Sequence, residues 1–415
     1  MKKLVEKLTL KMLNKKAPPN CIICTLSFAQ LFGNYIGICP MQGFCDHTKK
    51  KMSPHYVVST LKLIIGTIFS MVFVTILIGY LYLILQKGNK EIPKLQMIAE
   101  TIFCFQSTTL LLGYITKIKT HLLVVNGWVN LNENGKFFGI NTLLTETNSN
   151  LIQKRSCLTA FIIITATISF GVILYSLEID EKNFDITLFR RISVFLGTYV
   201  QLIVVFRISI YHYLLKNILK RYKDIILSHI NIRIPTLINN VQIDYNELVN
   251  SKNFKTQLTL FSRFYSAISL NMKHYNRLVN PMALIWFLCV LGVLIINIYL
   301  IVKEFNVDSI GNDSVLVELS TLFVSIGLLY IVKSVNSVIY VSDEISSILY
   351  RLPTRKLKQD EIEHLVNLIN NLSLQKPTLN ACDVFLVTTQ LLASISGTVV
   401  TYVLVALQFR PSWES

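Results

Sequence analysis

The sequence predicts an all-α polytopic membrane protein with seven transmembrane helices. Of its 415 residues, 52% are hydrophobic and only 15% are charged, whereas soluble domains carry about 25% charged residues. The mean hydropathy is correspondingly high, at +0.50. Several apolar runs also reach the roughly 20 residues that a helix needs to cross the hydrocarbon core of a bilayer.

These apolar runs are the expected spanning helices. They lie near residues 58–86, 97–118, 157–177, 192–215, 282–302, 316–340 and 384–409. An earlier apolar run, 21–39, is interrupted by Gly and Asn, so we interpret it as a re-entrant or interfacial segment.

The eight cysteines do not indicate a disulfide framework, because they are few and fall mostly in apolar stretches. Cys21 and Cys24, with Cys39, Cys45 and His47, could be drawn as a zinc site. Apolar residues fill the spacing between them, while zinc knuckles use polar turns that contain Gly. We therefore expect neither a metal nor a cofactor.

The basic residues indicate the orientation in the membrane. About three quarters of the 40 Lys and Arg residues fall on one side if the N-terminus is cytosolic, as the positive-inside rule requires. Seven spans then place the C-terminus outside. Asn312 opens a glycosylation sequon on the outer side in this topology. The formal charge of +16 thus reflects topology rather than nucleic-acid binding, and the basic N-terminus is expected to lie on anionic lipid.

Amphipathic helices are expected on the cytosolic side, over 215–226, 261–275 and 360–372, because their apolar residues recur at helical spacing. In a lone chain much of this apolar surface would be wet, which favours an oligomer with a packed cytosolic core. The expected segments are a cytosolic and interfacial N-terminus (1–57), spans 1 to 4 (58–215), a cytosolic helical loop (216–281), spans 5 and 6 (282–340), a cytosolic anchor helix (341–383), span 7 (384–409) and an extracellular tail (410–415).

A stripe of mostly polar side chains follows one face of the seventh span. Its members recur at steps of three or four residues: Gln390, Ser394, Thr398, Thr401, Val405 and Gln408. Because polar groups are costly against lipid, such a stripe suits a water-filled pore around a symmetry axis. The alternative is that these groups bond their own backbone or a neighbouring helix.

A motif at the end of this span resembles a known family. Residues 401–409 read Thr-Tyr-Val-Leu-Val-Ala-Leu-Gln-Phe, which is similar to the signature that closes the last span of insect gustatory receptors. Leu31-Phe32-Gly33 and Gly37-Ile38-Cys39-Pro40 also resemble the segment that precedes span 1 in that family. The resemblance implies a tetrameric, ligand-gated, non-selective cation channel in the plasma membrane of a sensory neuron. It places Val405 at a hydrophobic gate and Gln408 just outside it.

The resemblance also implies a small-molecule tastant as ligand and a homotetramer, or a hetero-oligomer with related receptors. Many sugar-sensing members carry Glu directly after Thr-Tyr, where this chain has Val403. A bitter or plant secondary compound is therefore the preferred ligand class, and a sugar is the alternative. The family's pocket lies among the outer halves of spans 2 to 6. Residues of suitable chemistry there are Glu100, Phe103, Gln106, Ser107, Tyr175, Phe195, Tyr199, Asn297 and Thr321.

Two of the polar side chains in the spans have other interpretations. Glu100 could simply reach headgroup water. Arg207 lies deeper in span 4, and a charge within the membrane is a functional candidate, although a structural bond to a helix end or to a lipid phosphate explains it equally well.

Three other classes of protein fit less well. A G-protein-coupled receptor needs an outside N-terminus and an Asp-Arg-Tyr or Asn-Pro-x-x-Tyr motif, which the sequence lacks. A secondary transporter would show internal repeats. An enzyme would need a catalytic constellation that the sequence does not contain.

Overall fold

The computed structural model describes residues 41–43, 56–86, 91–137, 184–229, 254–304, 312–352 and 354–408. Its helices are α3 (Thr60–Gln86), α4 (Glu91–Thr116), α5 (Ile118–Phe137), α7 (Phe184–His229), α9 (Phe254–Glu304), α10 (Asn312–Tyr350), the 3-10 helix η2 (Thr354–Lys356), α11 (Gln359–Leu374) and α12 (Thr389–Gln408). Two short antiparallel pairs complete the described elements: β1 (Met41–Gly43) with β2 (Tyr56–Val58), and β3 (Asn380–Ala381) with β4 (Phe385–Leu386).

Six described helices contain segments long and apolar enough to cross a membrane: α3, α4, α7, α9, α10 and α12. They coincide with six of the seven spans that the sequence predicts. The remaining predicted span, 157–177, and the predicted interfacial segment, 21–39, lie outside the described residues.

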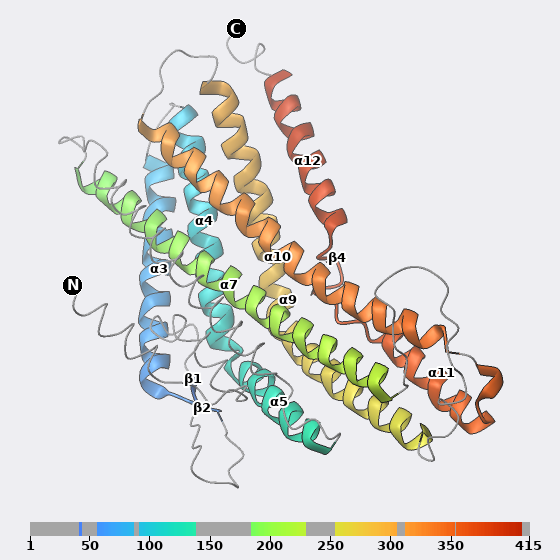
Figure 1. Cartoon of the computed structure of the whole chain (residues 1–415). Coiled ribbons are helices and arrows are strands. Elements are labelled where there is room, and N and C mark those ends of the chain that lie inside the picture. Colours follow the sequence, from blue (N-terminus) through green and yellow to red (C-terminus); the bar gives the residue numbers. More distant parts are fainter. Residues whose placement is uncertain are drawn as a thin grey trace, which may run out of the picture.

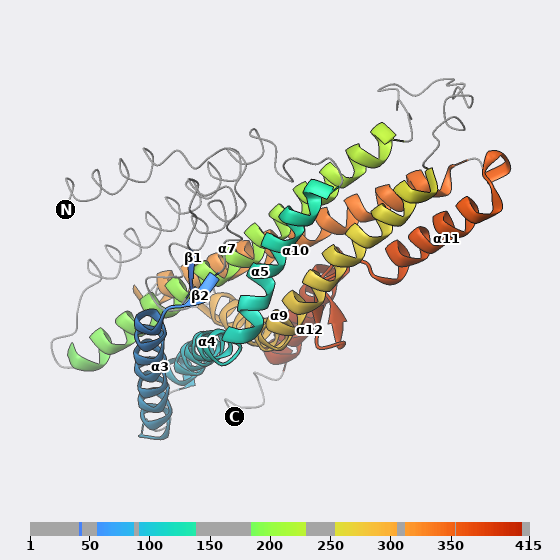
Figure 2. The ribbon, with the colours of Figure 1, turned by 90° about the horizontal axis from the view of Figure 1, so that it is seen from below.

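Three helices are much longer than a bilayer requires. Helices α7, α9 and α10 have 46, 51 and 39 residues. At 1.5 Å per residue each exceeds about 55 Å, against a hydrocarbon core of about 30 Å. All three run together past the end of α4 and form a second layer with α5 and α11 (Figures 1 and 2). Helix α9 changes direction near its middle (Figure 1), where Pro281 removes one backbone hydrogen bond.

The second layer is packed around buried hydrophobic side chains of the same chain, in a core that continues into the spanning helices. The predicted apolar faces of α7 and α9 are buried there, as Leu215, Tyr222, Phe261 and Tyr265 show. On α11 the predicted face is largely buried as well, with only Val366 markedly exposed. The expectation that a lone chain would leave these faces wet is therefore wrong. Each helix finds its partner surface on another helix of the same chain, so the amphipathic pattern alone gives no argument for an oligomer.

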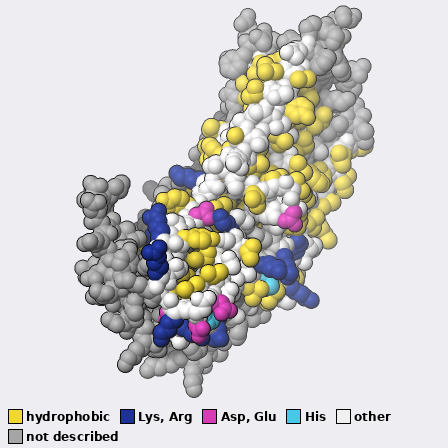
Figure 3. Space-filling view, turned by 90° about the vertical axis from the view of Figure 1, so that its right-hand side faces the viewer, with side chains coloured by type: hydrophobic (Ala, Val, Ile, Leu, Met, Phe, Trp, Pro, Cys, Tyr) yellow, Lys and Arg dark blue, Asp and Glu magenta, His cyan; other side chains and the backbone are white. Residues whose placement is uncertain are grey.

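The charged side chains separate from the apolar surface. On the face that carries α12 and α11, the described part of the upper half shows hydrophobic and uncharged groups, whereas Lys, Arg, Asp and Glu gather in the lower half (Figure 3). This division is the one expected for a chain with one end in a bilayer and the other in water.

Candidate functional site

Helix α12 buries one face and leaves the opposite face open. Ile395, Val399 and Val403 are buried, and the helix packs on α9 and α10. The predicted stripe lies on the other side, where Gln390, Ser394, Thr401, Val405 and Gln408 are exposed and Thr398 is half-buried. The side chain of Val405 is 40% exposed. The polar stripe is thus turned away from the rest of its own chain.

The hydroxyl groups of the stripe hydrogen-bond to their own helix. Ser394 donates to the carbonyl of Gln390 at 3.2 Å, Thr398 to that of Ser394 at 2.8 Å, and Thr401 to that of Gly397 at 2.8 Å. The sequence analysis allowed that these groups bond their own backbone, and the hydroxyl protons of Ser394, Thr398 and Thr401 do so. Each hydroxyl oxygen still has acceptor capacity, so the outward face remains able to bind water or a cation.

A β-hairpin fixes the start of α12. In the turn between β3 and β4, Cys382 and Asp383 have φ angles of 52° and 62°, and the Val384 amide donates to the Ala381 carbonyl at 3.0 Å. Positive φ at both central residues defines a type I′ turn, and Val384 completes a three-residue connection to β4. Short strands that pair across such a turn give almost no signal in the sequence, so the hairpin was not predicted.

The segment between α11 and α12 is tied to α9. The Tyr265 hydroxyl donates to the Gln375 carbonyl at 3.1 Å, and the Asn276 amide donates to the Thr378 carbonyl at 2.9 Å. These two bonds hold the segment that precedes α12 against α9.

The predicted ligand-binding residues fall in two groups. Phe103, Gln106 and Ser107 are buried on α4 and face α7 and α9. Gln106 donates its amide to the Trp286 carbonyl at 3.2 Å and accepts from the Gln201 amide at 2.7 Å. The Ser107 hydroxyl lies within hydrogen-bonding distance of two carbonyl oxygens, 3.0 Å from that of Phe103 and 3.3 Å from that of Gly197.

The second group of predicted residues lies elsewhere. Glu100, Tyr199 and Thr321 are half-buried, and Asn297 is buried on α9. The side chain of Phe195 and the whole of Tyr175 lie outside the described residues.

A small cavity lies beside the first group. It is lined from four helices by Phe103, Thr198, Gln201, Leu202, Val205, Trp286, Phe323, Val324 and Gly327. Its volume of about 20 Å³ is enough for about one water molecule. Glu100, Tyr199, Asn297 and Thr321 are not among its described lining residues. A larger ligand would therefore need the surrounding side chains to move.

Sequence reasoning missed Gln201 and Trp286 at this cavity. Both had a signal. Gln201 is an amide within the apolar run of span 4, and a polar group in a spanning helix is a candidate for function. Trp286 stands near the start of span 5, and a large aromatic side chain among aliphatic ones is a candidate pocket wall.

Arg207 has described partners. One of its guanidinium nitrogens lies 2.6 Å from His121 Nε2, and the guanidinium lies over the Tyr114 ring at 4.6 Å from its centroid. Burial, and then the charge of Arg207, lower the pKa of His121 well below its usual value of 6.5. His121 is therefore neutral. The described partners of Arg207 are two side chains, whereas the sequence suggested a helix end or a lipid phosphate as its structural partner.

The model of the 7tm chemosensory receptor family matches residues 22–412. The chain belongs to this family. The match covers nearly the whole length, so the receptor is a multi-pass membrane protein of a family that does not consist of enzymes. Among curated protein sequences, none matches it.

Two solved structures share the fold of this receptor. The insect olfactory receptor OR5 from Machilis hrabei is similar over 93% of this chain and 99% of that chain, with a TM-score of 0.63 and 12% identity. The structure of OR5 in complex with eugenol gives a TM-score of 0.64 at 11% identity, with the same coverage. This similarity confirms the all-α, seven-span fold that the sequence predicts.

Proposed function

We propose that the receptor is a gustatory receptor: a ligand-gated, non-selective cation channel in which four copies surround one pore. The observation that carries this proposal is the exposed stripe on α12. An uncharged spanning helix that presents Ser, Thr and Gln away from its own chain needs a polar environment on that side. Four such helices around an axis would provide it as a water-filled path.

The gate in this proposal is a ring of Val405 side chains. Four apolar groups that meet at a narrow point exclude water and hydrated cations until the ring widens. Thr401 lies one turn before this ring and Gln408 lies about one turn beyond it. The N-terminus is cytosolic and Gln408 is on the outer side, where Asn312, the first residue of α10, would be open to glycosylation.

The ligand site in this proposal is the small cavity beside Phe103, Gln106 and Ser107. Its wall joins aromatic rings to a few amide and hydroxyl groups, as a small-molecule site requires. Glu100, Tyr199, Asn297, Thr321, Phe195 and Tyr175 are proposed as outer contacts. The OR5 structure described as a complex with eugenol supports a small organic ligand. A bitter or plant secondary compound is the preferred class, and a sugar is the alternative.

The proposal is tested by whole-cell recording from cells that express only this chain, with a panel of bitter compounds and sugars and no added G protein. We expect a ligand-evoked cation current that survives block of endogenous G proteins. A current that disappears with that block would instead indicate the other candidate, a G-protein-coupled receptor. Phe103→Ala should shift the half-maximal ligand concentration, whereas Leu288→Ala, an exposed position on α9, should not.

The number of subunits is tested separately, by native mass determination of the purified receptor in lipid. We expect four copies. A monomer that still carries ligand-evoked current would contradict the shared pore, since a single stripe on α12 cannot enclose a path by itself.

A further inference from the structure

A second cavity lies between α4, α5, α7 and α9, and it shares no lining residue with the cavity beside Phe103. Its volume is about 60 Å³, enough for several water molecules or a small ion. It is built around Arg207, His121 and the stacked rings of Tyr211 and Tyr275, whose centroids are 3.5 Å apart. Nothing in the proposed channel function uses this cavity.

Several polar atoms of its wall are buried without a hydrogen-bond partner. These atoms are His121 Nδ1, Trp128 Nε1 and the hydroxyl groups of Tyr211 and Tyr275. A buried polar group without a partner costs about 1–3 kcal/mol, so four around one cavity indicate that something polar occupies it.

The unpartnered atoms of the wall are donors. Trp128 Nε1 can only donate. Arg207 has no acceptor, so His121 Nε2 must accept its proton, and neutral His121 then carries its own proton on Nδ1. Both tyrosine hydroxyls can donate as well. No carboxylate stands among the described lining residues, so the described part of the wall offers hydrogen-bond donors and no negative charge.

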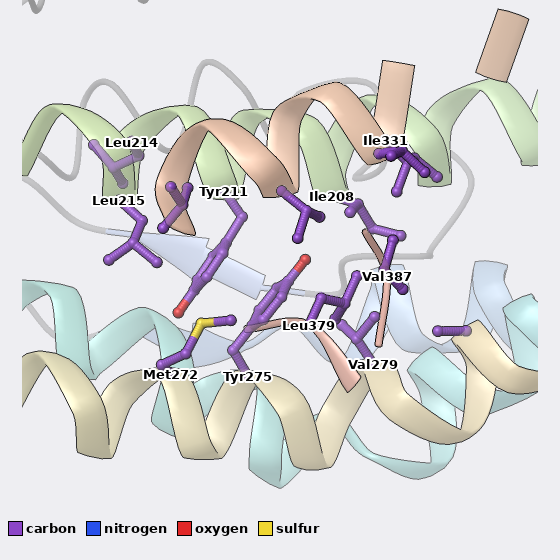
Figure 4. Close-up of a cluster of buried hydrophobic side chains, with 14 of the residues drawn as sticks. Ile208, Tyr211, Leu214, Leu215, Met272, Tyr275, Val279, Ile331, Leu379 and Val387 are labelled. Atoms are coloured by element: carbon purple, nitrogen blue, oxygen red, sulfur yellow. The ribbon is translucent and has the colours of Figure 1, made fainter. Parts of the chain in front are cut away.

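The two hydroxyl groups serve opposite ends of the cavity. Figure 4 shows the stacked rings of Tyr211 and Tyr275 with their hydroxyl groups pointing in opposite directions, that of Tyr275 toward Ile208. Tyr275 also interacts electrostatically with Arg207 and Tyr114. The Tyr275 hydroxyl therefore belongs to the end that holds the guanidinium, and Trp128 packs edge-on against Tyr211 at the other end, with centroids 5.2 Å apart.

We propose that this cavity is a binding site for one small monovalent anion, a halide or a short carboxylate, held by the Arg207 guanidinium and the Tyr275 hydroxyl. An anion accepts from every donor around it, whereas a water molecule must also donate and finds few acceptors in this wall. The bonds to a charged acceptor are the stronger kind. The anion would join α7 to α9, and this inference does not depend on the channel function.

The test is thermal unfolding of the full chain in lipid nanodiscs at constant ionic strength, with sodium bromide or sodium acetate replacing sodium gluconate. An anion that binds only the folded chain raises Tm with increasing concentration. Gluconate is too large for about 60 Å³ and serves as the reference. We expect Tm to rise with bromide or acetate along a saturable curve.

Two matched variants locate the effect. Tyr275→Phe keeps the ring stack and removes only the hydroxyl, so the apparent affinity for bromide should fall about tenfold. Tyr222→Phe also removes a buried hydroxyl, but that one donates to the Phe261 carbonyl at 2.9 Å outside the cavity, so bromide affinity should not change.

Two results would overturn the proposal: an equal Tm in bromide, acetate and gluconate, or a bromide response that Tyr275→Phe leaves unchanged. If Tyr275→Phe fails to fold, crystals of the parent chain soaked in bromide decide the question. An anomalous scattering peak in the cavity supports the site, and its absence at saturating bromide rules the site out.

Discussion

At the scale of single residues, the α12 stripe is the part of the site that the sequence predicts best. Helical spacing placed Gln390, Thr401 and Gln408 on one face, and the structure turns that face away from the chain. The pattern is readable because a spanning helix is otherwise apolar, so each polar residue stands out. The ligand residues were harder to predict, because the contact between Gln106 and Gln201 joins two helices that are far apart in the sequence.

The gate residue gives the first prediction. Val405→Thr keeps the volume of the side chain but adds a hydroxyl, so a ring of four should hold water more readily. We expect the current without ligand to rise at least about threefold, which corresponds to roughly 0.6 kcal/mol. Whole-cell recording measures it. Val400→Thr is the matched control, because Val400 is exposed on another face of α12, and an equal rise in that variant would remove the special role of Val405.

The second prediction concerns pH and His121. Because folding lowers the pKa of His121 through burial and the Arg207 charge, the unfolded chain binds more protons below about pH 6.5. The contribution of His121 to the free energy of unfolding is therefore fully present above that pH. It decreases as the pH drops, by at most about 1.4 kcal/mol per pH unit.

The variant His121→Gln keeps an acceptor for Arg207 but cannot titrate. We expect its Tm to fall less between pH 7 and pH 5 than the Tm of the parent. If His121→Gln lost Tm as steeply as the parent, the buried neutral histidine would not explain the acid sensitivity.

At the scale of elements, the sequence predicts helices well and their partners poorly. The apolar spacing of 215–226 and 261–275 predicts the extensions of α7 and α9, and the structure confirms both. Helix α5 was not predicted, because its polar residues mask the apolar period. Which surface covers an amphipathic face depends on tertiary packing, and for this reason the argument for a wet cytosolic surface failed.

Aromatic contacts connect the ligand cavity to the start of α12. Trp286, in the cavity wall, meets Phe287 edge-on with centroids 5.0 Å apart, and Phe287 meets Phe385 of β4 at 5.4 Å. Since β4 ends shortly before α12 begins, these rings offer a contiguous contact between the proposed ligand site and the proposed pore helix.

The third prediction tests this contact with Phe385→Leu. An aromatic pair contributes about 0.5–1.5 kcal/mol beyond its buried area, so the half-maximal ligand concentration should shift by about two- to tenfold. Single-channel conductance should stay the same, because Phe385 lies outside the stripe. Leu386→Ala, at the exposed neighbouring position, is the control. An unchanged dose response in Phe385→Leu would show that these rings do not couple ligand to gate.

At the scale of the whole molecule, the fold could be predicted from the composition of the chain, but the number of subunits could not. Apolar runs and charge asymmetry are properties of one chain, so seven spans could be predicted from them. A pore shared between chains leaves only an indirect trace, which is a polar face turned away from the rest of its own chain. The described part of α12 has such a face, and the central claim of this account is that it lines the pore.

Cysteine substitution on adjacent residues of α12 tests that claim most directly. Thr401 is on the stripe, and Val400 is exposed but lies about 100° away around the helix. Each is replaced by Cys, and a cationic thiol reagent is applied from outside while ligand holds the channel open. The account predicts that Thr401→Cys loses most of its ligand-evoked current and that Val400→Cys keeps its current, as does the parent. Block at Val400→Cys with none at Thr401→Cys, or no block at either while both conduct, would contradict it.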